Sequence, residues 1–171
     1  FDELAKQFIR EQGAARVVNI SNTTARRIRK AIKEGITEGL GQAEVAKNIR
    51  LLTEGVIARR RSRTIARTET HQAATYASHE VNKSFQIPNQ QKQWVAAVDE
   101  RTRQWHIDVD GKVVLADEDF IVRGVPMSYA GDPKGGAANV INCRCVTVYI
   151  DPEDDVIDAS SEPEDQSPFK I

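Results

Sequence analysis

A single proline, Pro88, marks the point at which the residue pattern of this chain changes. Before it, apolar residues recur every three or four positions, which is the spacing of one face of an α-helix. After it, apolar and polar residues alternate over short stretches, which is typical of β-strands. Candidate N-caps at residues 21–24 precede one of the helical patterns. The predicted helices cover residues 2–12, 21 to about 38, 42–53 and 57 to about 84.

The second half of the chain predicts a small sheet between about residues 91 and 150. Val95 and Ala97 alternate into one strand, and Asp110-Gly111 predicts a turn because glycine takes positive φ at no steric cost. The charged residues between them are therefore expected on a turn between strands. Residues 113–115 are predicted to form a strand that pairs back across the Asp110-Gly111 turn with the strand that contains Trp94. Further strands are predicted at residues 120–122 and 143–150, with a turn at 124–126 and a glycine-rich loop at 129–136. We predict an α+β fold, in which N-terminal helices through about residue 84 precede a small antiparallel β-sheet.

The charge of the chain is divided between a basic body and an acidic C-terminal stretch. Residues 151–171 hold eight acidic residues and one lysine, whereas residues 1–150 carry a net charge of +6. We predict a helical lead-in at 1–56, a long helix with the sheet at 57–150, and a disordered acidic tail at 151–171. No apolar run approaches the length of a membrane span, so we expect no membrane partner. Two cysteines in Cys-x-Cys spacing are not a secreted disulfide framework, which favours a reducing cytoplasm.

Two helical segments carry clusters of basic side chains that allow two interpretations. Such a cluster is usually a solvated helix face. It is also what a sequence-independent contact with DNA phosphates or with an acidic partner requires. No aromatic residue lies between the arginines of the second cluster, which disfavours binding of single strands. The candidate nucleic-acid-binding residues are Arg26, Arg27, Arg29, Lys30, Arg59, Arg60, Arg61 and Arg63.

Glu69 falls within the apolar stripe of the longest predicted helix. A buried carboxylate needs a partner, because an unpaired buried charge is very costly. We predict an ion pair between Glu69 and an arginine of the second half, Arg101 or Arg103 first and Arg144 second. Loss of such a partner predicts a cost on the order of 3 kcal/mol for Glu69→Gln. The alternatives are a general base, a carboxylate of a metal site, or simple exposure to solvent.

His106, Cys143 and Cys145 form a candidate zinc site, because imidazole and thiolate groups are the usual ligands of zinc. The two cysteines are two residues apart and therefore lie on one face of a strand. A fourth ligand is expected from His71, Asp99 or Asp108, and the sequence does not choose among them. Three alternatives stay open: buried free thiols, a strained disulfide, and a histidine that only donates a hydrogen bond to Asp99 or Asp108.

Three groups of residues, taken in order, resemble a known family. They are Arg67-Thr68-Glu69-Thr70, then Asp99-Glu100-Arg101-Thr102-Arg103 with His106 and Asp110-Gly111, then Gly131-Asp132-Pro133 with Asn142-Cys143-Arg144-Cys145. The set resembles the phage Mu F-like minor head proteins, also called phage head-morphogenesis proteins. The likeness covers roughly residues 40–150.

The resemblance implies a structural protein of the virion and not an enzyme. Its implied partners are the phage portal and capsid proteins, and its implied roles are capsid assembly and DNA packaging or ejection. Assembly in the host bacterial cytoplasm follows from the same resemblance. Some related domains are joined to toxin domains, so an enzyme is one alternative: a nuclease-like or transferase activity that uses His106, Glu69 and arginines. A nonspecific nucleic-acid-binding module is the other.

Overall fold

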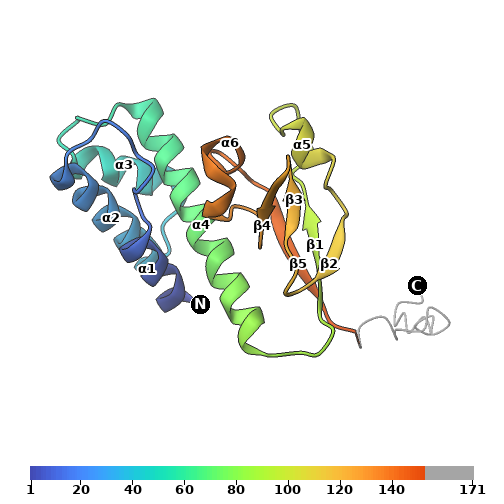
Figure 1. The fold of residues 1–171 in the computed structure, drawn as a ribbon. Helices are drawn as coiled ribbons and strands as arrows, with labels where there is room; N and C mark the ends of the chain where they lie inside the picture. Colours follow the sequence, from blue (N-terminus) through green and yellow to red (C-terminus); the bar gives the residue numbers. More distant parts are fainter. Residues whose placement is uncertain (153–171) are drawn as a thin grey trace, which may run out of the picture.

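Four helices make up the first half of the chain, and a small sheet follows them (Figure 1). The structure is a computed structural model that describes residues 1–152. The helices are α1 (Asp2–Glu11), α2 (Asn22–Thr37), α3 (Gln42–Leu52) and α4 (Arg59–Ser84). Their ends fall within two residues of the predicted ones. The predicted α+β fold class is therefore confirmed. The predicted acidic tail lies outside the described residues from residue 153 onward.

Local capping interactions explain why the helices begin where they do. The Oγ atom of Ser21 accepts a hydrogen bond from the amide of Thr24 at 3.1 Å, which satisfies a free N–H of the first turn of α2. At the start of α3, the carboxylate of Glu44 accepts from the amide of Gly41 at 3.1 Å. Between these helices, Gly39 adopts a φ of +65°, a conformation that ends α2 and that glycine takes without strain.

The helical half has its own hydrophobic core, which includes the N-terminal part of α4. Phe8, Ile32 and Ile49 come from α1, α2 and α3, and each is at least 97% buried. They pack with residues of α4 that include Ile65 and Ala73. Figure 1 shows α4 running between the other three helices and the sheet. This helix therefore connects the two halves of the fold.

The second half contains a three-stranded and a two-stranded antiparallel sheet. The larger sheet has the order β2-β1-β5 and the smaller one pairs β3 with β4. The predicted pairing of residues 113–115 with the strand that contains Trp94 is confirmed. The strands are β1 (Gln91–Val95), β2 (Val113–Leu115), β3 (Phe120–Val122), β4 (Val125–Met127) and β5 (Val146–Ile150).

The turn predicted at residues 124–126 lies one residue earlier. Arg123 and Gly124 have φ angles of +53° and +76°, so these two residues form the turn between β3 and β4. Pro126 belongs to β4, opposite Ile121. A proline is tolerated there because the two-stranded sheet leaves one side of β4 without a hydrogen-bonded strand.

Three short helical segments were not predicted from the sequence. They are α5 (Gln104–Ile107), the 3₁₀-helix η1 (Pro133–Gly135) and α6 (Gly136–Val140). The residue pattern predicts a turn where α5 lies, and a glycine-rich loop that includes η1 and only the first residue of α6. Segments of three to five residues are too short to show a helical period.

A second hydrophobic core lies under the sheet and is tied to α4 by polar contacts. Trp94 is fully buried, and its ring meets that of Phe120 edge-on at a centroid distance of 5.5 Å. From α4, the Nε2 of Gln72 donates to the carbonyl of Gly131 at 3.0 Å. The Oγ1 of Thr68 accepts from the amide of Asn142 at 3.0 Å. These contacts hold the loops of the second half against the helix.

Within residues 1–152, no helix has both the length and the apolar character needed to cross a membrane.

Candidate functional site

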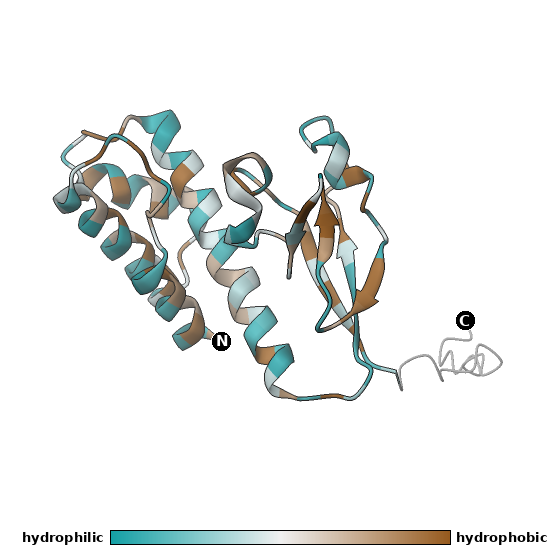
Figure 2. Cartoon of the chain, in the orientation of Figure 1, coloured by the Kyte–Doolittle hydropathy of each residue, from teal (hydrophilic) through white to brown (hydrophobic). Residues whose placement is uncertain are grey.

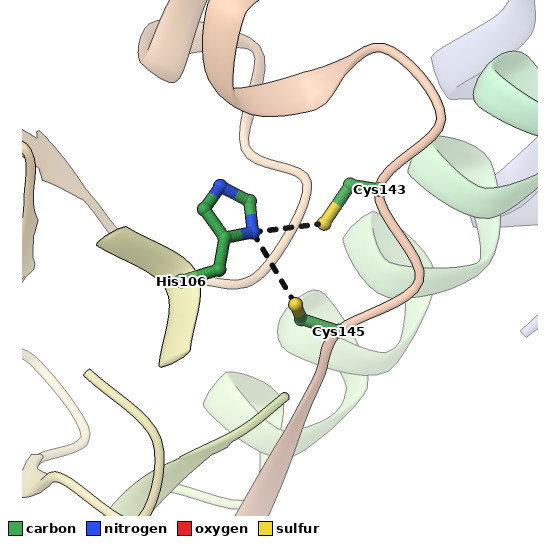
Figure 3. A group of neighbouring side chains, drawn as sticks. All are labelled: His106, Cys143 and Cys145. Carbon is green, nitrogen blue, oxygen red and sulfur yellow. Dashed lines mark hydrogen bonds between the residues drawn. The ribbon is translucent and has the colours of Figure 1, made fainter. Parts of the chain in front are cut away.

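His106, Cys143 and Cys145 come together in one buried cluster (Figure 3). The Nδ1 atom of His106 lies 3.3 Å from the Sγ of Cys145 and 3.7 Å from the Sγ of Cys143. All three side chains are at least 98% buried. The three residues predicted as zinc ligands are therefore neighbours in space.

Each member of the cluster is positioned by a different local feature. His106 lies on α5, and its ring is perpendicular to that of Trp94 at a centroid distance of 5.5 Å. Cys143 follows α6, and Cys145 immediately precedes β5. The strand register places β5 directly beside β1, which contains Trp94. Trp94 thus packs against the imidazole and lies on the strand beside β5, whose first residue follows Cys145.

Both cysteines are free thiols, so the structure has no disulfide between them. The thiol of Cys143 donates to the sulfur of Cys145, and this hydrogen bond lowers the pKa of Cys145. His106 contributes to the same lowering. Conversely, the pKa of Cys143 is raised, because its proton is held in that hydrogen bond and because the group is buried. Two sulfurs and an imidazole nitrogen within 4.8 Å of one another can act together as ligands of one cation.

None of the three residues considered as a fourth ligand belongs to this cluster. Asp99 is exposed and pairs with Arg144, and Asp108 is exposed and accepts from the Nε2 of Gln104 at 2.9 Å. His71 lies on α4, where burial lowers its pKa and its Nε2 has no hydrogen-bond partner. The alternative in which His106 donates to Asp99 or Asp108 is also wrong, since its Nδ1 faces the sulfurs and its Nε2 has no partner.

Asp99 and Arg144 form a bidentate ion pair, which is not among the interactions predicted from the sequence. Both guanidinium NH2 groups of Arg144 contact the carboxylate, one of them at 2.6 Å. The Asp99 carboxylate also accepts from the amide of Arg101 at 2.9 Å. The bond to Arg144 is the main reason that the pKa of Asp99 is held far below its usual range. This pair joins the loop after β1 to the residue between the two cysteines.

The predicted ion pair of Glu69 with an arginine of the second half is wrong. Glu69 is 95% buried, as predicted, but its carboxylate accepts from the backbone amide of Ala14 at 2.9 Å. Ala14 follows α1 with a φ of +58°, so its N–H has left the helical hydrogen-bond pattern and needs another acceptor. Burial raises the pKa of Glu69, while the Ala14 bond and the nearby Arg16 and Arg29 act in the opposite direction.

The arginines that were expected to pair with Glu69 line an open surface instead. One depression is bordered by Arg67, Arg101, Arg103 and Arg144 together with Ile141 and Asn142. A second depression shares Arg67 and Asn142 and continues along the start of α4. We call the combined patch the arginine surface. It consists of Arg59, Arg60, Arg63, Arg67, Arg101, Arg103 and Arg144.

The arginine surface carries an excess of unpaired positive charge. Among residues 1–152, Arg144 alone of its seven arginines has a carboxylate partner within ion-pair distance. Arg103 donates to the carbonyl of Ile141 at 2.6 Å, which orients the guanidinium without neutralising it. Such a concave cluster of cations attracts polyanions.

The other predicted nucleic-acid-binding residues are engaged elsewhere. Arg27 pairs with Glu54 at 2.8 Å, and the Nε of Arg29 donates to the carbonyl of Gly13 at 2.7 Å. The remaining contacts are those of Lys30 with Glu34, of Arg26 with Thr23 and of Arg61 with the carbonyl of Val18. The structure therefore brings Arg59, Arg60 and Arg63 into the arginine surface but not the cluster on α2. The sequence did not predict that Arg101, Arg103 and Arg144 would lie beside the arginines of α4, because this proximity arises only in the folded chain.

Residues 26–148 match the family described as "Phage Mu protein F like protein". The chain belongs to this family of phage proteins, which confirms the resemblance drawn from the sequence motifs. No solved structure matches the chain.

Three curated relatives show where related chains are found. The chain is 36% identical over 125 residues to minor head protein GP7 of Bacillus phage SPP1. It is 34% identical over 140 residues to a protein of Enterococcus faecalis named NAD(+)--arginine ADP-ribosyltransferase EFV. It is 36% identical over 93 residues to the uncharacterized protein YqbB of Bacillus subtilis. The matches cover 70%, 79% and 52% of this chain but 39%, 28% and 30% of the respective relatives. The chain thus spans well under half the length of each.

Proposed function

We propose that this chain is part of a phage minor head protein that acts at the portal, between the capsid proteins and the packaged DNA. In this role it assists head assembly and the packaging or ejection of DNA. The proposal is supported by membership of the Mu F-like family and by the similarity to a minor head protein. It implies a place in the virion, after assembly in the cytoplasm of the host bacterium.

The observation that carries the proposal is the arginine surface. Its arginines come from α4, from the loop between β1 and α5, and from the residue between the two cysteines. Arginine binds phosphate oxygens through its planar, multiply donating head group. Contacts of this kind neutralise phosphates without reading base edges, so we expect binding to duplex DNA that is independent of sequence. A protein next to the path of packaged DNA requires binding of this type.

A second surface supports a protein partner. One face of the β2-β1-β5 sheet carries Val113, Leu115, Val146 and Val148, all of them at least 40% exposed. The strand register aligns them with Gln91, Gln93 and Val95 of β1 on the side opposite Trp94. Figure 2 shows β2 as a hydrophobic strand at the side of the molecule that lies away from the helices. We assign this face to contact with the portal or capsid protein, because exposed apolar residues gathered on one face are typical of protein interfaces.

DNA binding by the full chain tests the proposal, with affinity measured over a range of salt concentrations. Replacing Arg59, Arg60 and Arg63 by alanine removes three charges from the arginine surface. We expect the slope of log K against log salt to decrease by roughly 2 to 3, since each neutralised phosphate contributes about 0.9. The matched control replaces Arg26, Lys30 and Lys33, which are exposed on α2, by alanine. Equal losses in both triple variants would contradict the assignment of this surface.

We propose that this part of the chain is not an enzyme. The alternative requires His106, Glu69 and an arginine around one open cleft. Glu69 borders a depression with Arg16 and Arg61, whereas His106 borders a different one with Arg101 and Arg103. Both residues are also almost completely buried.

The name of the Enterococcus faecalis relative defines the activity to be tested. The chain is incubated with labelled NAD⁺ and an arginine-rich acceptor protein, and transfer of the label is measured. We expect none above the level of a heat-inactivated sample. Time-dependent transfer that is lost in Glu69→Gln would establish an enzyme.

A further inference from the structure

We propose that His106, Cys143 and Cys145 bind one zinc ion through Nδ1 and the two Sγ atoms. This goes beyond the proposed role in the phage head and does not depend on it. The three donor atoms all lie within 4.8 Å of one another. They are a borderline nitrogen ligand and two soft sulfur ligands, the combination that zinc accepts most readily in proteins.

The distances within the cluster fit a shared ion. Zinc–nitrogen and zinc–sulfur bonds of about 2.0 and 2.3 Å at a tetrahedral angle place the two donors about 3.5 Å apart. The Nδ1 atom of His106 lies 3.3 Å from one sulfur and 3.7 Å from the other. Shifts of a few tenths of an ångström therefore suffice to admit the ion. Figure 3 shows both sulfurs turned toward the same nitrogen.

The surroundings of the cluster provide a fourth coordination position. A small space of about 10 Å³ is lined by the three donors together with Ala97, Thr102 and neighbouring residues. This volume holds roughly one water molecule. We assign the fourth position to water, because no other His, Cys, Asp or Glu among residues 1–152 joins the group. The space is too small for a substrate, so the ion has a structural role.

The charge balance of a zinc-bound cluster also suits its burial. Two thiolates and Zn²⁺ together are neutral, which removes the cost of an isolated buried charge. The ion links α5, which carries His106, to the segment between α6 and β5, which carries both cysteines. Arg144 lies between the two cysteines, and Arg103 is the N-cap of α5, which carries His106. Zinc therefore helps to fix the position of two members of the arginine surface. A site of this kind stabilises the second half of the fold.

The direct test is metal analysis of the full chain, purified under reducing conditions from cells grown with zinc. We expect about one zinc ion per chain, and removal by a strong chelator should lower the melting temperature markedly. Replacement of zinc by Co²⁺ should give the intense visible bands of tetrahedral cobalt together with thiolate charge-transfer absorption. This measurement on the unaltered chain does not depend on whether any variant folds.

Variants then assign the ligands. Cys143→Ser, Cys145→Ser and His106→Gln should each lose most of the bound metal, while His79→Gln retains it. His79 is the control because it lies on α4 outside the cluster and bonds to the hydroxyl of Tyr149 at 2.6 Å. His71→Gln should also retain the metal, since water takes the fourth position. Metal loss in His71→Gln, or full zinc content in both cysteine variants, would overturn the assignment. An unaltered chain that contains no metal, gives no cobalt spectrum and melts identically with chelator would overturn the site itself.

Discussion

The backbone amide of Ala14 donates a 2.9 Å hydrogen bond to the carboxylate of Glu69, which ties the end of α1 to the middle of α4. A side-chain acid therefore satisfies an amide that the end of a helix leaves unpaired. This arrangement changes what a substitution at Glu69 should do. An amide at position 69 keeps an oxygen acceptor for Ala14, whereas a methyl group does not.

We predict that Glu69→Gln changes the free energy of unfolding at pH 7 by less than about 1 kcal/mol, because the hydrogen bond is kept and a buried charge is removed. Glu69→Ala should cost about 2 to 3 kcal/mol, since it leaves the buried amide of Ala14 unsatisfied. Denaturant unfolding of both variants measures the difference. A cost near 3 kcal/mol for Glu69→Gln, the value expected for a broken buried ion pair, would instead indicate an arginine partner.

The pH dependence of stability gives an independent test of the same residue. Burial raises the pKa of Glu69 in the folded state above its unfolded value of about 4.3. Folding thus favours the protonated acid. The stability that this gives is fully present below the unfolded pKa and is lost as the pH rises through the folded pKa. Wild-type stability should therefore fall across this window relative to Glu69→Gln. A constant difference between the two from pH 4 to pH 8 would contradict the raised pKa.

The pKa of Asp99 is shifted in the opposite direction to that of Glu69, because Asp99 forms an ion pair with Arg144. Its pKa is depressed, so the stability it gives is present above the unfolded pKa of about 3.9 and is lost as the pH falls through the folded pKa. An NMR titration of the Asp99 carboxyl should show a midpoint below that of an ordinary aspartate. In Arg144→Gln its midpoint should rise toward the ordinary value. An ordinary midpoint in the unaltered protein would mean that the pair does not persist in solution.

The sequence indicated the four long helices well because they are long enough to show a period. The strands were indicated less well: β1 ends at Val95, before Ala97, and β4 lies where a turn was predicted. Ser21 as the cap of α2 and the pairing of residues 113–115 with β1 followed from local residue types. The partner of Glu69 did not, because a backbone amide has no signature in the sequence. The short helix α5 was missed for lack of length, although His106 on it was recognised as part of the candidate site.

The positions of the basic residues in the sequence did not predict the arginine surface. Both basic clusters looked equivalent in the sequence, yet the contacts of Arg27 and Arg29 lie within the helical half. Arg101, Arg103 and Arg144 looked like partners for a buried acid and instead extend the surface of α4. The packing of α4 against the loops of the second half determines which arginines line the same depression. This tertiary contact cannot be read from the order of the residues.

Deletion of residues 151–171 should strengthen DNA binding at low salt. This stretch holds eight acidic residues and one lysine, so its removal raises the net charge of the chain by seven. The attraction to phosphates should increase, and the increase should disappear at high salt, where such interactions are screened. A chain in which the eight acids are replaced by their amides is the matched control and should behave like the deletion. Unchanged affinity at low salt would remove the acidic stretch from the account.

The proposed contact of the apolar sheet face with the portal protein can be tested by placing charges on that face. Val113→Lys combined with Val148→Lys places two charges on this face, and both positions are exposed, so the fold should be retained. Binding to the purified portal protein of the same phage should fall at least tenfold, because desolvating a charge in an apolar interface is costly. The control, Val18→Lys with Val56→Lys, alters two other exposed valines outside the sheet and should bind normally. Equal binding by both double variants would place the contact elsewhere.

The most direct test of the proposed role is the quantity of this protein in purified virions of the phage that encodes it, measured by mass spectrometry against the portal protein. We predict a constant, low copy number relative to the major capsid protein. We also predict a strong reduction when Val113 and Val148 are both replaced by lysine, but not when Val18 and Val56 are. Virions of normal composition that lack the protein altogether would contradict a role in the phage head.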